Sequence, residues 1–203
     1  MRYAAIMLGI SGGFAMTGGC GSQCGGAQSS TTPLVLDFND APVQFQQGGG
    51  EFDLGAGLDA ATDWPTAATP WLAMDRNGNG KIDDGSELFG SDTRLASGEE
   101  AANGFEALQE LDSDGDGRIT PADRAWPKLL VWSDRNGDRV SSPDELAPLS
   151  RFGITWIGLD YVSEWTCNDR GDCEGQRAPF AFVVRGEARE GKVIDLYLEY
   201  QSD

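Results

Sequence analysis

The segment DSDGDGRITPAD, residues 112–123, places three aspartates at alternate positions of a short Gly-containing loop. A helix-flanked calcium loop of twelve residues needs side-chain oxygens at positions one, three and five, and Gly at six. It also needs a backbone carbonyl at position seven and a carboxylate at twelve. These positions are held in order by Asp112, Asp114, Asp116, Gly117, the carbonyl of Arg118, and Asp123. The segment therefore predicts a calcium-binding loop.

The alternative interpretation of residues 112–123 is an acidic turn in solvent. Three aspartates at alternate positions repel one another, and this costs free energy unless a cation lies between them. Calcium fits better than magnesium, because magnesium demands stricter octahedral geometry and keeps its waters. Phe105, Leu108 and Leu111 precede the loop at helical spacing, and Thr120-Pro121 follows it as a helix start. We expect the helix, loop, helix arrangement of an EF-hand.

A second loop of this kind is DRNGDRVSSPDE, residues 134–145. Position six is Arg139 instead of Gly, and a non-Gly residue at positive φ costs roughly 1 kcal/mol, so this loop is either strained or bent differently. The apolar run 129–132 before it predicts a strand, so this loop would be half an EF-hand. Ser142 to Glu145 also forms a capping box, which is the alternative role for that glutamate. The expected ligands are Asp134, Asn136, Asp138, the carbonyl of Val140, and Glu145.

The third loop is DRNGNGKIDDGSE, residues 75–87, in which position twelve is Ser86 and not an acid. Either a one-residue expansion lets Glu87 close the loop, or Asp83 closes it together with water. The expected ligands are Asp75, Asn77, Asn79, the carbonyl of Lys81, Asp83 and Glu87. Up to three calcium ions are therefore expected.

The composition excludes several kinds of function. The chain has 203 residues, with 33 acidic and 15 basic side chains, a net charge of −18 and no histidine. Nucleic acid is not an expected partner, because phosphate requires a basic surface. The absence of histidine from the sequence excludes Ser-His-Asp and Cys-His nucleophiles and His-containing metal sites. We expect one acidic domain over residues 33–203, without enzymatic activity.

The N-terminal residues indicate export. A positive charge at Arg2, an apolar stretch and small residues before Cys20 are typical of an export signal over residues 1–19. Lipid attachment at Cys20 and plain secretion both stay open, so the expected location is a membrane anchor on the periplasmic or surface side, or the exterior. Residues 20–32 read as a flexible tether. Cys167 and Cys173 are expected to form a local disulfide.

The expected fold class is α+β, with short helices and EF-hand-like loops packed against a small, mostly antiparallel sheet. Residues 162–203 would extend this unit at its C-terminal end. Two apolar runs, 178–185 and 192–200, predict the strands of a hairpin connected by residues 186–191.

Four segments together resemble the self-processing module of iron-regulated RTX-type bacterial proteins. They are PLVLDF at 33–38, MDRNGNGKIDDGSELFG at 74–90, AANGFEALQELDSDGDGRI at 101–119, and LLVWSDRNGD at 129–138. The resemblance implies calcium binding and an α+β fold around EF-hand-like loops. Some members cleave themselves at an Asp-Pro bond directly before the module. This chain has Thr32-Pro33 at that position and no Asp-Pro anywhere in its sequence, so we expect no self-cleavage.

Calcium with a mainly structural role is the expected function, the domain folding when it meets calcium outside the cytoplasm. The alternative is a calcium-organised adhesion module that binds a glycan or a protein. Candidate contacts for that role are Trp64, Trp71, Trp156 and Trp165, although spaced tryptophans more often lie in the core or are half-buried. A self-processing or hydrolytic enzyme is the least favoured interpretation. The only expected membrane contact is the lipid anchor.

Overall fold

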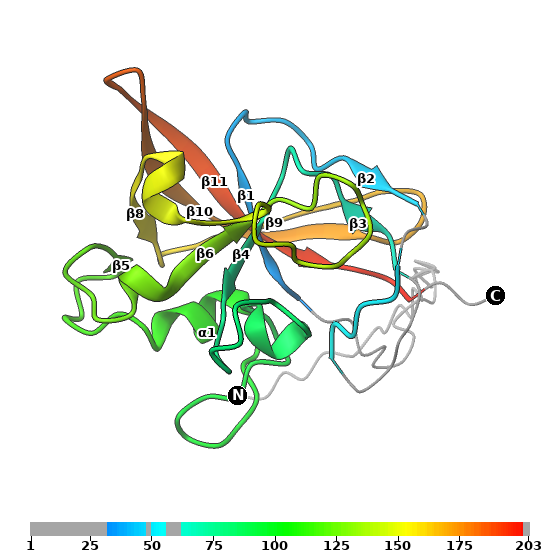
Figure 1. Cartoon of the computed structure of the whole chain (residues 1–203), viewed down its shortest axis with the longest axis horizontal. Helices are drawn as coiled ribbons and strands as arrows, with labels where there is room; N and C mark the ends of the chain where they lie inside the picture. Colours follow the sequence, from blue (N-terminus) through cyan, green and yellow to red (C-terminus); the bar gives the residue numbers. More distant parts are fainter. Residues whose placement is uncertain (1–31, 48–49, 56–61, 201–203) are drawn as a thin grey trace, which may run out of the picture.

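The computed structural model describes residues 32–47, 50–55 and 62–200, and these form a mostly β structure (Figure 1). The predicted α+β class is therefore wrong. One α-helix, α1 (Gly104–Gln109), occurs in the described ranges, and its length is 6 residues. None of the helices in these ranges is long and apolar enough to cross a membrane. Residues 1–31, with the predicted signal, Cys20 and most of the tether, lie outside the described part.

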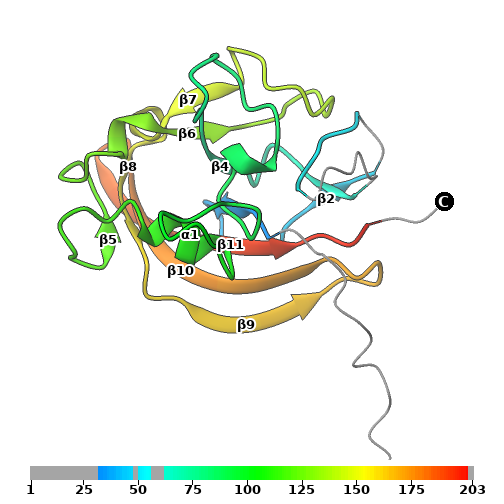
Figure 2. The same cartoon turned by 90° about the horizontal axis from the view of Figure 1, so that it is seen from below.

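Nine strands form one antiparallel sheet in the order β5-β8-β10-β11-β1-β4-β6-β7, with β9 also paired to β10. Figure 2 shows that this sheet curls, with β6 and β7 on one side and β9 and β10 on the other. A small second sheet pairs β2 with β3. The bounds are β1 Leu34–Asp37, β2 Phe45–Gln46, β3 Trp64–Pro65, β4 Trp71–Met74, β5 Arg118–Ile119, β6 Leu129–Trp132, β7 Leu146–Pro148, β8 Ile154–Gly158, β9 Val162–Cys167, β10 Cys173–Val184 and β11 Glu187–Tyr197.

The helix expected after Thr120-Pro121 is replaced by turns and a single 3₁₀ turn, η2 (Trp126–Lys128). The strand β6 begins directly afterwards at Leu129, as predicted. The segment between loop and strand is therefore too short for a nucleated α-helix. Two other 3₁₀ turns are η1 (Gly85–Glu87) and η3 (Leu149–Phe152). The helix, loop, helix prediction for residues 112–123 is wrong on its C-terminal side.

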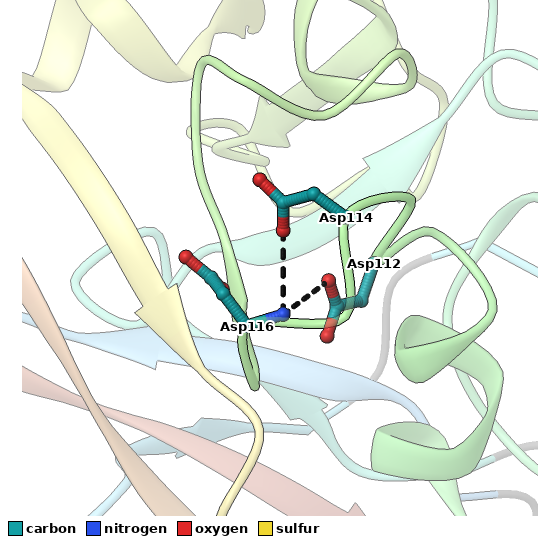
Figure 3. Close-up of side chains that lie close together, drawn as sticks. All are labelled: Asp112, Asp114 and Asp116. Atoms are coloured by element: carbon teal, nitrogen blue, oxygen red, sulfur yellow. Dashed lines mark hydrogen bonds between the residues drawn. The ribbon is translucent and has the colours of Figure 1, made fainter.

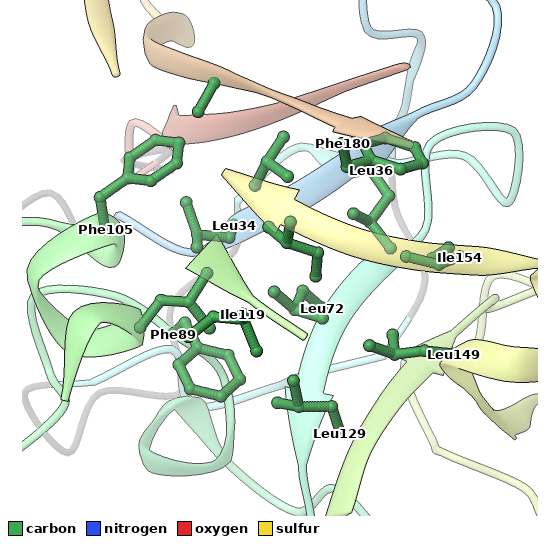
Figure 4. Close-up of a cluster of buried hydrophobic side chains, with 14 of the residues drawn as sticks. Leu34, Leu36, Leu72, Phe89, Phe105, Ile119, Leu129, Leu149, Ile154 and Phe180 are labelled. Carbon is green, nitrogen blue, oxygen red and sulfur yellow. The ribbon is translucent and has the colours of Figure 1, made fainter. Parts of the chain in front are cut away.

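The strand β1 lies inside the sheet and buries all four of its residues. Leu34 and Leu36 point to one core, which also contains Phe105 of α1 and Phe180 of β10 (Figure 4). Val35 points to the opposite face. The second core is mainly aromatic, with Phe52, Trp64, Trp71 and Trp132 in contact through their rings. A continuous apolar run such as LVLD fits a strand covered on both faces.

The C-terminal hairpin is present, but its strands are longer than predicted. The turn contains only Arg185 (φ 54) and Gly186 (φ 84), because residues 187–191 pair with residues 180–184. Left-handed φ values at both central residues suit a two-residue hairpin turn. Cys167 and Cys173 form the predicted disulfide, which joins the end of β9 to the start of β10.

Asp195 in β11 is fully buried, and its Oδ1 has no hydrogen-bond partner among the described residues. Its Oδ2 accepts the N–H of Gly104 at 2.9 Å, at the start of α1. Burial raises the pKa of Asp195 well above its ordinary value, although hydrogen bonds from Gly104 and Thr32 act in the opposite direction. The folded chain therefore keeps this carboxyl protonated at a pH where the unfolded chain ionises it.

Asp195→Asn is expected to remove a loss of stability that the parent shows on going from acidic to neutral pH. Below the unfolded pKa of about 3.8 both states are protonated, so the carboxyl costs nothing extra. As the pH rises toward the folded pKa, only the unfolded state ionises, and folding loses up to about 1.4 kcal/mol per pH unit. Urea unfolding of parent and variant from pH 4 to 7 measures this. If the difference in unfolding free energy between the parent and the variant stays constant with pH, this prediction is contradicted.

Candidate metal centres

The loop 112–123 brings its three alternating aspartates together. Carboxylate oxygens of Asp112, Asp114 and Asp116 lie within 4.8 Å of one another (Figure 3). Partial desolvation and then repulsion from Asp116 raise the pKa of Asp114. A cation between the three carboxylates would relieve this repulsion. The donors are all hard oxygens, which calcium prefers.

The first aspartate of this loop also holds the turn of the backbone. Asp112 accepts the N–H of Gly115 at 2.8 Å on one oxygen and the N–H of Gly117 at 2.9 Å on the other. Both glycines have positive φ, 76 and 81. The same bonds recur in the other two loops, where Asp75 accepts from Gly78 and Gly80, and Asp134 accepts from Gly137 and Arg139.

The closing acid of loop 112–123 is buried at the opposite end. Asp123 is 2% exposed and accepts the N–H of Ser113 at 2.7 Å and of Thr120 at 2.8 Å. Burial opposes its ionisation, but hydrogen bonds from Thr120 and Ser113 outweigh burial and lower the pKa of Asp123. The carboxylate of Asp123 is therefore charged, and hydrogen bonds from positions two and nine of the loop hold it in place.

The loop 134–145 forms the second acidic group, in which oxygens of Asp134, Asp138 and Glu145 lie within 4.8 Å of one another. Glu145 is buried and accepts the N–H of Arg135 at 2.8 Å and of Ser142 at 3.2 Å. These donors again occupy positions two and nine. The bond from Ser142 is also the one that a capping box would make, although the structure has turns at residues 143–145 and no helix.

Arg139 has a positive φ of 60, so of the two alternatives, strain at position six or a differently bent loop, the structure has the first. Its side chain is buried, with the guanidinium 5.0 Å from the ring centre of Trp64. It donates to the carbonyl of Thr62 at 2.6 Å. The cost of the left-handed conformation is thus offset by contacts that Gly could not make.

The loop 75–87 closes through Glu87. This side chain is 1% exposed and accepts the N–H of Arg76 at 2.9 Å and of Asp83 at 2.8 Å, again positions two and nine. Glu87 is therefore the closing acid of this loop, as Asp123 and Glu145 are of the other two. The extra residue of the loop lies in η1. Asp83 has a different environment, since its carboxylate accepts the side-chain amides of Asn77 and Asn79.

Position seven is oriented in the same way in all three loops. The side chain at position five accepts the N–H of position seven at 2.8 to 2.9 Å. The pairs are Asn79 with Lys81, Asp116 with Arg118, and Asp138 with Val140. At position three, Asn77, Asp114 and Asn136 each accept the N–H of position five. The predicted ligands of each loop thus lie on one recurring backbone frame.

Sequence reasoning missed a bridge between two of the loops. The buried hydroxyl of Ser141 accepts the N–H of Ile82 at 2.7 Å and donates to the carbonyl of Ile82 at 3.1 Å. Both residues occupy position eight of their loops, 134–145 and 75–87. In the third loop, position eight is Ile119, which pairs with Ile157 of β8. The sequence signal that could have indicated this bridge is that Ser141 and Ile82 hold the same position, position eight, in their loops.

The aromatic candidates divide by exposure. Trp64 and Trp71 are 0% and 1% exposed, so they belong to the core, which is the more common place for spaced tryptophans, and they are not surface contacts for a ligand. Trp156 is half-buried beneath the guanidinium of Arg118. Trp165 is 54% exposed on β9 and packs against Tyr197.

Comparison with known proteins identifies the family. The model of the SPM domain matches residues 34–199, which include all three loops and the sheet from β1 to β11. The chain belongs to the SPM domain family. Iron-regulated protein FrpA of Neisseria meningitidis serogroup C is 42% identical to this SPM domain over 134 residues. That match covers 64% of this chain and 12% of the length of FrpA, and it confirms the relationship drawn from the four quoted segments.

Proposed function

We propose that this SPM domain binds three calcium ions, one in each of the loops 75–87, 112–123 and 134–145, and that the ions stabilise its fold. The observation that carries the proposal is the frame shared by the three loops. In each, the first aspartate accepts the N–H groups of positions four and six, and a buried acid accepts those of positions two and nine. In two of the loops the acids also converge, Asp112 with Asp114 and Asp116, and Asp134 with Asp138 and Glu145.

The ions would act mainly on stability. A ligand that binds only the folded state contributes RT ln(1 + [L]/Kd), about 1.4 kcal/mol per site at ten times Kd. Three sites would then contribute about 4 kcal/mol, which is a large part of the stability of an ordinary domain. Three divalent ions would also reduce the formal charge from −18 to −12. This would lessen repulsion within the folded chain.

The calcium level outside a cell suits such sites, since extracellular modules have dissociation constants of roughly 0.1 to 1 mM. The disulfide between Cys167 and Cys173 supports an oxidising location. We therefore place the domain outside the cytoplasm, either secreted or held by a lipid at Cys20.

Thermal unfolding of the chain in excess chelator, in millimolar calcium and in millimolar magnesium tests this function. We expect calcium to raise the midpoint by about 10 °C or more, because about 4 kcal/mol shifts a domain of this size by roughly 2–4 °C per kcal/mol. Magnesium should raise the midpoint much less, because it requires a strict octahedral arrangement of ligands that does not match the loop. Superimposed curves in chelator and calcium would reject the proposal.

A further inference from the structure

A hollow beside the tip of the β10–β11 hairpin has a charge opposite to that of the chain. It has a volume of about 600 Å³, and its charged lining residues are Arg151, Arg185 and Arg189. Its lining contains no acidic residue, although the sequence has 33 acids and 15 bases. We call this surface the arginine groove. Its composition differs sharply from that expected of an average surface on this chain.

The floor of the arginine groove is apolar. Phe38, Phe152 and Phe182 line it, and the ring of Phe38 lies 5.8 Å from Phe152 and 5.0 Å from Phe182. At its rim, Val183 and Val184 are 41% and 37% exposed. Both valines line the hollow, so its rim adds exposed apolar surface to the phenylalanine floor.

Two elements hold these groups in place. Figure 1 shows the hairpin tip extending beyond the rest of the sheet, next to η3. Val183 donates its N–H to the carbonyl of Gly153 at 2.9 Å, which fixes the tip to the residue that ends η3. The groove is therefore built on paired backbone and is not a gap between free loops.

The three arginines of the groove make few ion pairs with the described residues. Arg189 makes a loose ion pair with Glu187, at 3.7 Å, and its side chain stays 59% exposed. Arg151 and Arg185 are exposed and form no ion pair with any residue between 32 and 200 that the structure describes. Arg151 also lines a second hollow, whose charged lining residues include Asp144 and Glu145. A guanidinium binds a carboxylate through two parallel hydrogen bonds.

We propose that the arginine groove binds a short acidic peptide segment that carries apolar side chains. The arginines would pair with its carboxylates, and the phenylalanine floor would bury an apolar side chain between them. A short segment fits better than an anionic bilayer, because a bilayer is an extended surface that would also face the acidic remainder of the chain. For a peptide confined to the groove, salt screens the repulsion from acidic side chains that lie farther away than about one Debye length.

The probe is the synthetic peptide acetyl-DFDLD-amide with a fluorescent label, titrated with the full chain in millimolar calcium and read by fluorescence anisotropy. We expect saturable binding that weakens at least about tenfold in the triple variant R151Q/R185Q/R189Q. The charge-matched control is R94Q/R124Q/K128Q, which changes three exposed residues outside the groove. The control should bind within about twofold of the parent, since its groove is intact.

Three results would overturn the proposal. The first is equal weakening in both triple variants, which would indicate only general electrostatic attraction. The second is equal binding of acetyl-DSDSD-amide, which has the same charge and no apolar side chain. The third is no peptide binding together with binding to phosphatidylglycerol vesicles that the groove variant loses, which would assign the surface to lipid. Because the three arginines are exposed, the variant should keep the parent's unfolding midpoint, and this shows that the fold is intact. None of these outcomes depends on whether the three loops hold calcium ions.

Discussion

Glu145→Gln is expected to weaken calcium binding at the loop 134–145 by roughly 10- to 100-fold, or about 1.5–3 kcal/mol. The substitution keeps the shape of the side chain and removes its charge. Glu145 accepts two backbone N–H groups and the hydroxyl of Ser142, and an amide can accept on only one of its two ends. The variant thus loses both a charged ligand and part of the frame that closes the loop. Calorimetric titration with calcium measures the loss.

The matched control for this change is Glu99→Gln, at an exposed glutamate outside the three loops. It alters the net charge equally and should leave all binding steps unchanged. Glu87→Gln should behave like Glu145→Gln, because its carboxylate makes the equivalent bonds. If the two closing-acid variants bind calcium as the Glu99 variant does, these glutamates do not close calcium loops.

Ser141→Ala is expected to destabilise the chain by about 2–6 kcal/mol and to weaken calcium binding at two loops together. The change leaves the N–H and the carbonyl of Ile82 without their shared hydroxyl partner in a buried place. Each unsatisfied buried group costs about 1–3 kcal/mol. Because Ile82 belongs to one loop and Ser141 to the other, loosening the bridge affects both. Urea unfolding and calcium titration of the variant measure the two effects.

The loop 112–123 serves as an internal reference for this prediction. Its position eight, Ile119, pairs with Ile157 of β8 and belongs to a different core cluster from Ile82. Its calcium step should therefore stay unchanged in Ser141→Ala. Ser97→Ala, at an exposed serine, should cost less than about 0.5 kcal/mol. A uniform weakening of all three calcium steps would show a general loss of stability and would contradict coupling through Ser141.

The loops were predictable because their structure is local. Alternating short acids, with Gly at the positions of positive φ, determine the backbone through bonds between residues two to five positions apart. The closing acids are farther along the chain, yet Glu87 could be proposed because its offset from the template is only one residue. The positive φ of Arg139 was one of two alternatives, because the sequence also allowed a differently bent loop.

The fold class was not predictable from that template. An EF-hand loop in sequence suggests two flanking helices, but only α1, before the loop 112–123, is an α-helix in the part of the chain described. Strands flank the other two loops instead, with β4 before 75–87, and β6 and β7 on either side of 134–145. Turns and η2 follow 112–123. Pairings such as β1 with β11 join residues more than 150 positions apart, and no local pattern reveals them. The Ser141 bridge and the buried Asp195 depend on the same long-range arrangement.

Native mass spectrometry, together with equilibrium dialysis in ⁴⁵Ca, counts the calcium ions that the folded chain holds. We expect three ions for the parent. We expect two ions for each of the variants Asp75→Ala, Asp112→Ala and Asp134→Ala at calcium concentrations that saturate the parent. A parent that holds no calcium, or a count that the three variants leave unchanged, would contradict the proposal of one ion in each loop.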